Sequence, residues 1–139
     1  GKISGPLLDR VDLHVEVTPV PFHELSSARS PETSSAIRQR VVRARALQTA
    51  RFADRQEVRC NAQMDGRLLR KTCAVDAAGQ HLLQSAMDRL HLSARAYDRI
   101  LKVARTIADL ADSSDIRAEH IAEAIQYRSL DRERWGMRL

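Results

Sequence analysis

Apolar side chains recur at helical spacing between residues 97 and 111, and this stripe constrains the fold more than any other feature of the sequence. It consists of Tyr97, Ile100, Leu101, Ala104, Ile107, Ala108 and Ala111. A stripe that covers one side of a helix must be buried against other elements. Ser93 stands just before it and is a preferred N-cap residue. The sequence therefore predicts a domain organised around one long amphipathic helix.

Four other segments carry the same kind of pattern. We predict helices from about Ser35 to Phe52, from an N-cap at Asp65 to near Cys73, after Asp76, and from about Arg117 to Tyr127. The first of them should bury a face made of Ile37, Val41, Ala44 and Gln48. Aromatic residues make up only 4% of the chain, and a core of aliphatic residues suits packed helices better than a sheet sandwich. The predicted fold is mainly α, with five helices enclosing one core over residues 35–130.

Residues 11–17 show a different pattern, in which apolar and polar side chains alternate. Val11, Leu13, Val15 and Val17 alternate with Asp12, His14 and Glu16. A period of two predicts a β-strand, but a single strand is not stable without partners. No second convincing strand follows. We therefore expect residues 1–17 to be the end of a larger core, with one orphan strand whose sheet lies upstream.

Two segments are expected to lack regular structure. Residues 18–34 contain three prolines among several serines, which predicts a linker that is mobile between Ser26 and Ser34. Residues 131–139 are rich in charge and should form a frayed tail, with Trp135 as its one anchoring side chain.

No catalytic or metal-binding motif is complete in this sequence. Gly1-Lys2 resembles the end of a phosphate-binding loop, but Ile3 stands where the motif requires Ser or Thr. No apolar strand ends in the paired acids that would hold magnesium. The cysteines and histidines do not have the spacing of metal ligands; they are Cys60, Cys73, His14, His23, His81, His91 and His120. We expect no ATP hydrolysis, metal site or cofactor in this chain by itself.

Composition bounds the compartment and the partners. Two cysteines are too few for a disulfide framework and favour a reducing cytoplasm, and no apolar run is long enough to span a bilayer. The net charge of +5 favours anionic partners such as nucleic acid or nucleotide phosphates. A solvated, arginine-rich surface would explain the same charge.

The N-terminal segment carries the first family signature. Residues 7–13 read Leu-Leu-x-Arg-hydrophobic-Asp-Leu. This resembles the stretch that precedes the last core strand in the magnesium-chelatase and minichromosome-maintenance branch of AAA+ ATPases. The resemblance implies that Arg10 is an arginine finger, which neutralises charge on the phosphate of ATP bound to the neighbouring subunit. The alternative is that Arg10 only pairs with Asp9 or Asp12 in a turn.

The long helix carries the second signature. Residues 92–110 resemble the lid helix that bears the sensor-2 arginine in the same branch, and Arg95 takes that position near the helix start. At about 100° per residue, Arg95, Arg99 and Lys102 share a face opposite the apolar stripe. The resemblance implies that Arg95 contacts ATP phosphate, with Arg99 as a second candidate. The alternative is an ordinary solvated basic face.

Three further segments point to one group within this branch of ATPases. Residues 93–101, residues 124–132 and Asn61-Ala62 are most similar to the ComM/YifB group of magnesium-chelatase-like proteins. The similarity implies a C-terminal lid of a hexameric ATPase that remodels DNA in natural transformation and branch migration. ATP and magnesium would then be bound by the parent ring. The implied partners are an upstream AAA+ core, neighbouring subunits and DNA.

Two other functions remain open from the sequence. The same fold would serve the motor subunit of a chelatase that inserts magnesium or cobalt into a tetrapyrrole. Alternatively, the chain is a free-standing basic helical domain that binds DNA, because seven arginines lie between Ser35 and Arg59 against only Asp54 and Glu57. The first alternative predicts no stimulation of ATPase activity by DNA, and the second predicts salt-sensitive binding of duplex DNA by this chain alone.

Overall fold

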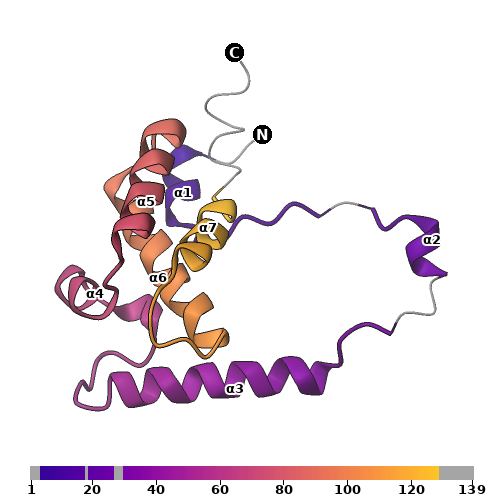
Figure 1. Ribbon diagram of the computed structural model, residues 1–139, viewed down its shortest axis with the longest axis horizontal. Coiled ribbons are helices and arrows are strands. Elements are labelled where there is room, and N and C mark those ends of the chain that lie inside the picture. Colours follow the sequence, from indigo (N-terminus) through magenta and orange to yellow (C-terminus); the bar gives the residue numbers. More distant parts are fainter. Residues whose placement is uncertain (1–3, 18, 27–29, 129–139) are drawn as a thin grey trace.

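The computed structural model describes residues 4–17, 19–26 and 30–128, and over these residues the chain is mainly α-helical (Figure 1). The helices are α1 (Gly5–Arg10), α2 (Phe22–Leu25), α3 (Ser34–Arg51), α4 (Gly66–Thr72), α5 (Ala77–Leu90), α6 (Ala94–Leu110) and α7 (Ala118–Gln126), with a short 3-10 helix η1 (Asn61–Gln63) before α4. The predicted mainly α fold is therefore confirmed, and α3 to α7 are the five helices expected from the sequence.

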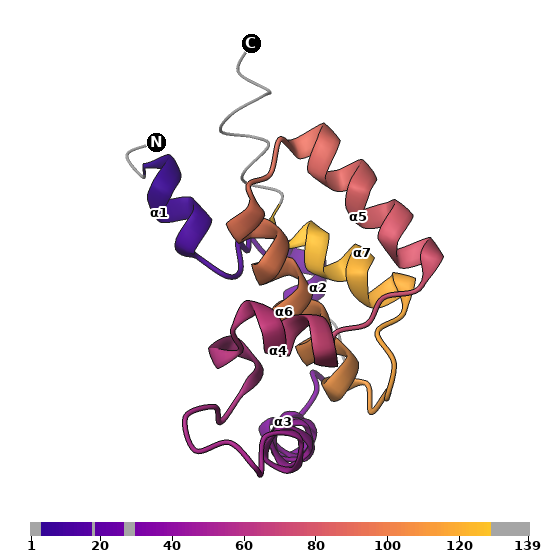
Figure 2. The ribbon, with the colours of Figure 1, turned by 90° about the vertical axis from the view of Figure 1, so that its left-hand side faces the viewer.

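Helix α6 is the centre of the packed body. It contacts α1, α3, α4, α7 and η1, while α5 lies against α7. Figure 2 shows α6 in the middle of these helices. Ile100, Ala104 and Ala108 are completely buried on its apolar stripe. At the end of the stripe, Ala111 is exposed because it lies beyond the last turn. The stripe thus organises the core, as the sequence predicts.

Local signals place the helix starts correctly because they act through short-range hydrogen bonds. The side chain of Asp65 accepts from the Leu68 N–H at 2.8 Å, and that of Asp76 accepts from the Gly79 N–H at the same distance. Ser93 Oγ accepts from the Ala96 N–H at 3.2 Å. Each cap satisfies an amide that has no partner within the helix.

The orphan strand expected at residues 11–17 is not formed within this chain. These residues have no regular secondary structure and form no ladder, and the only β-interaction in the described parts of the chain is an isolated bridge between Val75 and Ile116. A strand requires a neighbour, and here the His14 N–H instead donates to the Tyr127 carbonyl at 2.7 Å. His14 is the only buried residue between Val11 and Val17, and the apolar residues of the segment are exposed.

The linker contains one element that the sequence did not predict, the single turn α2, which lies far from the helical body in Figure 1. Part of the predicted mobile segment, residues 27–29, lies outside the described residues, as do the predicted tail at 131–139 and Trp135. Helix α3 leaves the body at its N-terminal end. Of its predicted buried face, Ala44 and Gln48 are buried, whereas Ile37 and Val41 are 44% and 43% exposed.

Gly79→Ala should destabilise the domain, although alanine is the better helix former. A Cβ at this buried position in α5 would lie 2.3 Å from Val75 Cγ1, and the stiff valine has little room to move. We expect a loss of about 1–3 kcal/mol in the free energy of unfolding, measured by urea denaturation. Gly66→Ala is the matched control, because its Cβ would meet only Arg70 Nη1 at 3.5 Å. Equal stability of the two variants would contradict this packing.

Candidate functional site

The carboxylate of Asp109 lies inside the helical body and joins α6 to α3. Asp109 is 1% exposed. Arg51 at the end of α3 donates from Nη2 to Oδ1 at 2.7 Å and from Nη1 to Oδ2 at 2.9 Å. Arg105, one turn earlier on α6, places its Nη2 3.3 Å from Oδ1. The pair with Arg51 is bidentate, the geometry in which a guanidinium binds a carboxylate most strongly.

Asn61 brings the loop before α4 into the same cluster. Its Nδ2 donates to Asp109 Oδ2 at 2.9 Å, and its Oδ1 accepts from Arg51 Nη1 at 2.9 Å. Its backbone N–H donates to Gln48 Oε1 at 2.9 Å. We call Gln48, Arg51, Asn61, Arg105 and Asp109 the Asp109 cluster. It fastens α3, η1 and α6 to one another.

The side chains of the Asp109 cluster bind one another and the backbone of this chain. Both Asp109 oxygens are occupied by donors from the protein, and Arg105 donates in addition to the Ser113 and Ser114 carbonyls at 2.8 and 3.0 Å. These carbonyls follow the end of α6, where a cation is favoured. No group of metal-ligating side chains exists among the described residues. The cluster therefore holds helices together and offers no open ligand position.

Sequence reasoning missed this cluster, although one signal pointed to it. Gln48 fell on the predicted apolar face of α3, and a buried polar side chain needs a partner. Nothing in the sequence indicated that the partner would be Asn61, because the contact crosses a loop.

A second buried arginine fixes the N-terminal segment to the helical body. Arg128, two residues after the end of α7, is 1% exposed. Its Nη2 donates to the Leu8 carbonyl at 3.2 Å and its Nη1 donates to the Val11 carbonyl. His14 adds the backbone bond to Tyr127 and a contact of 3.4 Å from its Nε2 to the Leu8 carbonyl. Segments more than a hundred residues apart in sequence therefore meet at the end of α1.

Arg10, the predicted finger, is the last residue of α1 and is exposed. Its side chain makes no hydrogen bond or ion pair with the side chains that the structure describes. Of the two alternative partners in the turn, Asp12 pairs with Arg99, and the side chain of Asp9 lies outside the described residues.

Arg95 and Arg99, the predicted phosphate contacts, differ in their surroundings. Arg95 is the second residue of α6, is exposed, and is unpaired within the described residues. Arg99 is engaged by Asp12, and Lys102 Nζ donates to the Ala62 carbonyl at 3.2 Å. The basic face of α6 thus points away from the core, as predicted, but two of its three cations hold neighbouring segments.

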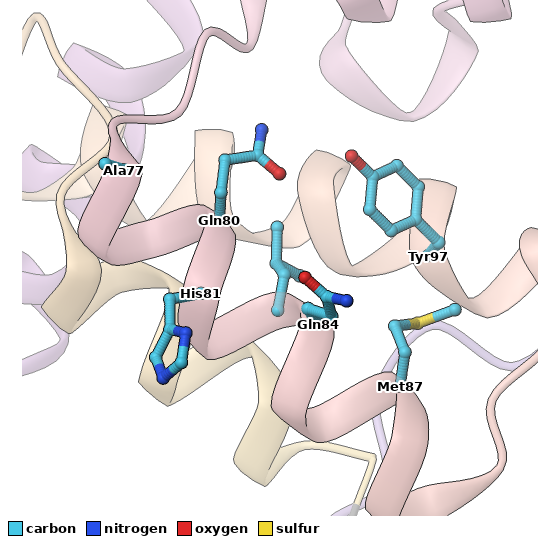
Figure 3. Close-up of a pocket in the computed structure, with 7 residues that line it drawn as sticks. Ala77, Gln80, His81, Gln84, Met87 and Tyr97 are labelled. Atoms are coloured by element: carbon cyan, nitrogen blue, oxygen red, sulfur yellow. The ribbon is translucent and has the colours of Figure 1, made fainter.

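A hollow of about 510 Å³ lies between α5 and α6. Gln80, His81, Gln84, Met87 and Tyr97 are among the residues that line it (Figure 3). The lining contains no Arg or Lys, so no cationic side chain is available there to pair with an anion.

The chain matches known proteins over most of its length. Residues 31–128 match the family described as magnesium chelatase, subunit ChlI C-terminal. The chain belongs to this family. It is 38% identical to competence protein ComM of Haemophilus influenzae and 39% identical to an uncharacterized protein YifB of Escherichia coli, in both cases over 94% of the chain. It is 40% identical to an uncharacterized protein of Mycobacterium bovis over 92% of the chain.

These matches confirm the predicted resemblance to a C-terminal region of the ComM/YifB group. The chain spans 25% of the length of each of these relatives. The match to the magnesium chelatase family covers Arg95, Arg128 and the Asp109 cluster, and begins after Arg10. No helix in the described ranges is long and apolar enough to cross a membrane.

The two cysteines are free thiols in different surroundings, so no bridge joins them. Cys73 is 5% exposed, and burial raises the pKa of its thiol, although a hydrogen-bond contact with Thr72 opposes the rise. Cys60 is partly exposed.

Alkylation should separate these thiols. A raised pKa keeps Cys73 protonated to higher pH, and only the thiolate reacts, so Cys73 should react much more slowly than Cys60 at pH 8. Iodoacetamide labelling followed by mass spectrometry of the peptides should show Cys60 modified first. Equal rates in the native protein would contradict the burial of Cys73, and unfolding in urea should make the rates similar.

Asp109→Ala should cost about 3–5 kcal/mol in the free energy of unfolding, because it leaves the guanidinium of Arg105 buried without its carboxylate. Asp98→Ala is the control on the exposed side of the same helix, and it should change stability by no more than about 0.5 kcal/mol. Both values come from denaturant titration. If Asp109→Ala were as stable as the control, the Asp109 cluster would not hold the body together.

Proposed function

We propose that this chain is the lid region of an ATP-driven AAA+ motor subunit that remodels DNA as a hexamer. The observation that carries the proposal is the 38% identity, across 94% of the chain, to a protein named for competence. The lid itself would not hydrolyse ATP. Its role would be to pass the nucleotide state of one subunit to the next, with ATP and magnesium held by an upstream core.

Arg10 suits the task of an arginine finger. It is exposed, its side chain is unpaired among the described side chains, and the buried Arg128 binds the carbonyls of Leu8 and Val11 on either side of it. A guanidinium in this state is available to a neighbouring subunit, where it would neutralise charge that develops on phosphate during cleavage. Arg95 suits a sensing role, because it lies in the first turn of α6, where the helix end favours an anion.

A second candidate function has the same fold but a different substrate. The family description names magnesium chelatase, which favours a motor subunit that drives metal insertion into a tetrapyrrole. The two functions differ in what stimulates ATP hydrolysis by a full-length protein that carries this chain. Duplex or branched DNA should stimulate the DNA motor, and a porphyrin-binding partner protein should stimulate the chelatase motor.

The isolated chain should not bind ATP. A lid without a phosphate-binding loop offers single arginines and no cradle for the phosphates. Isothermal titration of the chain with ATP and magnesium should give no heat of binding at micromolar concentrations. A micromolar dissociation constant would overturn the proposal, and salt-sensitive binding of duplex DNA by the same sample would favour the free-standing DNA-binding domain.

Arg10→Ala in the full-length protein should leave ATP binding nearly intact and lower turnover by a factor on the order of 10³–10⁵. A finger acts on charge that develops in the transition state, so kcat should fall while KM changes little. Arg67→Ala is the control, an exposed arginine on α4 that is unpaired in the described residues. Mixed rings give the decisive readout. Subunits with Arg10→Ala should regain activity beside subunits that cannot bind ATP but retain Arg10, and parental turnover by the Arg10→Ala ring would refute the finger.

A further inference from the structure

Arg128 binds the short stretch of backbone that carries Arg10. Its guanidinium spans two carbonyls, those of Leu8 and Val11, which lie on either side of Arg10 in the chain. Helix α1 has only six residues, and a helix of that length is not stable by itself. The position of Arg10 therefore depends on contacts that come from outside α1.

The burial of Arg128 makes these contacts specific. A guanidinium that is 1% exposed must satisfy its donors within the protein, and here it binds the Val11 carbonyl and the Leu8 carbonyl, which also accepts the capping Val11 N–H. The His14 N–H bond to the Tyr127 carbonyl holds the chain just after α1 to the same end of α7. The residues that follow α7 thus add to the contacts between α1 and α6 in setting the direction of α1.

We propose that Arg128 is a positioning residue for Arg10, so that the lid places the finger. This inference rests on the proposed function of Arg10. Arg128 would not touch ATP. It would hold the α1 backbone so that the Arg10 side chain meets the neighbouring subunit's nucleotide at a fixed distance from the lid.

Replacement by lysine is the sharpest test, because it keeps the charge and the aliphatic stem. A planar guanidinium reaches two carbonyls at once, whereas an ammonium group acts as a single point donor. Arg128→Lys in the full-length protein should lower kcat by about 10²-fold with little change in the KM for ATP, the cost of a displacement of about 1 Å in a catalytic group. Arg67→Lys is the matched control at an exposed position of α4, and it should leave kcat and the KM for ATP at parental values.

Mixed rings separate positioning from loss of structure. Subunits with Arg128→Lys should regain turnover beside subunits that cannot bind ATP but keep both arginines, because their own nucleotide sites are intact. They should not regain it beside Arg10→Ala subunits, which supply no finger. Parental turnover by the Arg128→Lys ring, or a loss that neither mixture repairs, overturns the inference.

Hydrogen exchange gives a second readout that does not depend on turnover. Exchange in Arg128→Lys should accelerate over residues 4–17 and stay at the parental rate over α6. Acceleration over α6 as well would show that Arg128 supports the whole lid, which overturns a specific role. If Arg10→Ala itself retains parental turnover, the proposed finger fails, and the positioning role fails with it. If Arg10→Ala is inactive and Arg128→Lys is active, only the positioning role fails.

Discussion

The rest of the structure depends on the hydrogen bonds and ion pairs of the buried Asp109 carboxylate. Burying a charge costs several kcal/mol unless it is paired and hydrogen-bonded, and here Arg51, Arg105 and Asn61 supply donors to its two oxygens. These donors come from three separate segments, so the carboxylate is stable only when α3, η1 and α6 are all in place. The cluster thereby selects one arrangement of helices whose apolar faces alone would pack in several ways.

The body so formed gives the N-terminal segment something to bind. Helix α1 is too short to hold its own position, and the irregular residues after it form no ladder with any described segment. Arg128 and the Tyr127 carbonyl supply the missing partners from the end of α7. As a result Arg10 is exposed yet lies on a fixed piece of backbone, which is what a residue that acts on another subunit requires.

Sequence reasoning succeeded where the physics is local. The five helices, the N-caps at Asp65 and Ser93 and the helix start after Asp76 depend on residues within one or two turns, and the structure confirms them. The alternating pattern at residues 11–17 forms no strand in this chain, because a strand needs a partner and the local pattern supplies none. The same holds for the contacts of Asp109 and Arg128, which cross wide gaps in sequence. The roles of Arg10 and Arg95 stay predictions that rest on family resemblance and on their exposure.

In the proposed mechanism, α1 and the helical body move as one unit. Spin labels at Leu7→Cys in α1 and Gln126→Cys at the end of α7 would measure this directly, in a full-length protein with Cys60→Ser and the buried Cys73 retained. Both positions are exposed, so the labels should not disturb the core. If the two move as one unit, double electron–electron resonance should give one narrow distance distribution between the labels. That distribution should be the same with ATP, with ADP and without nucleotide. A distance that changes with the nucleotide would contradict it.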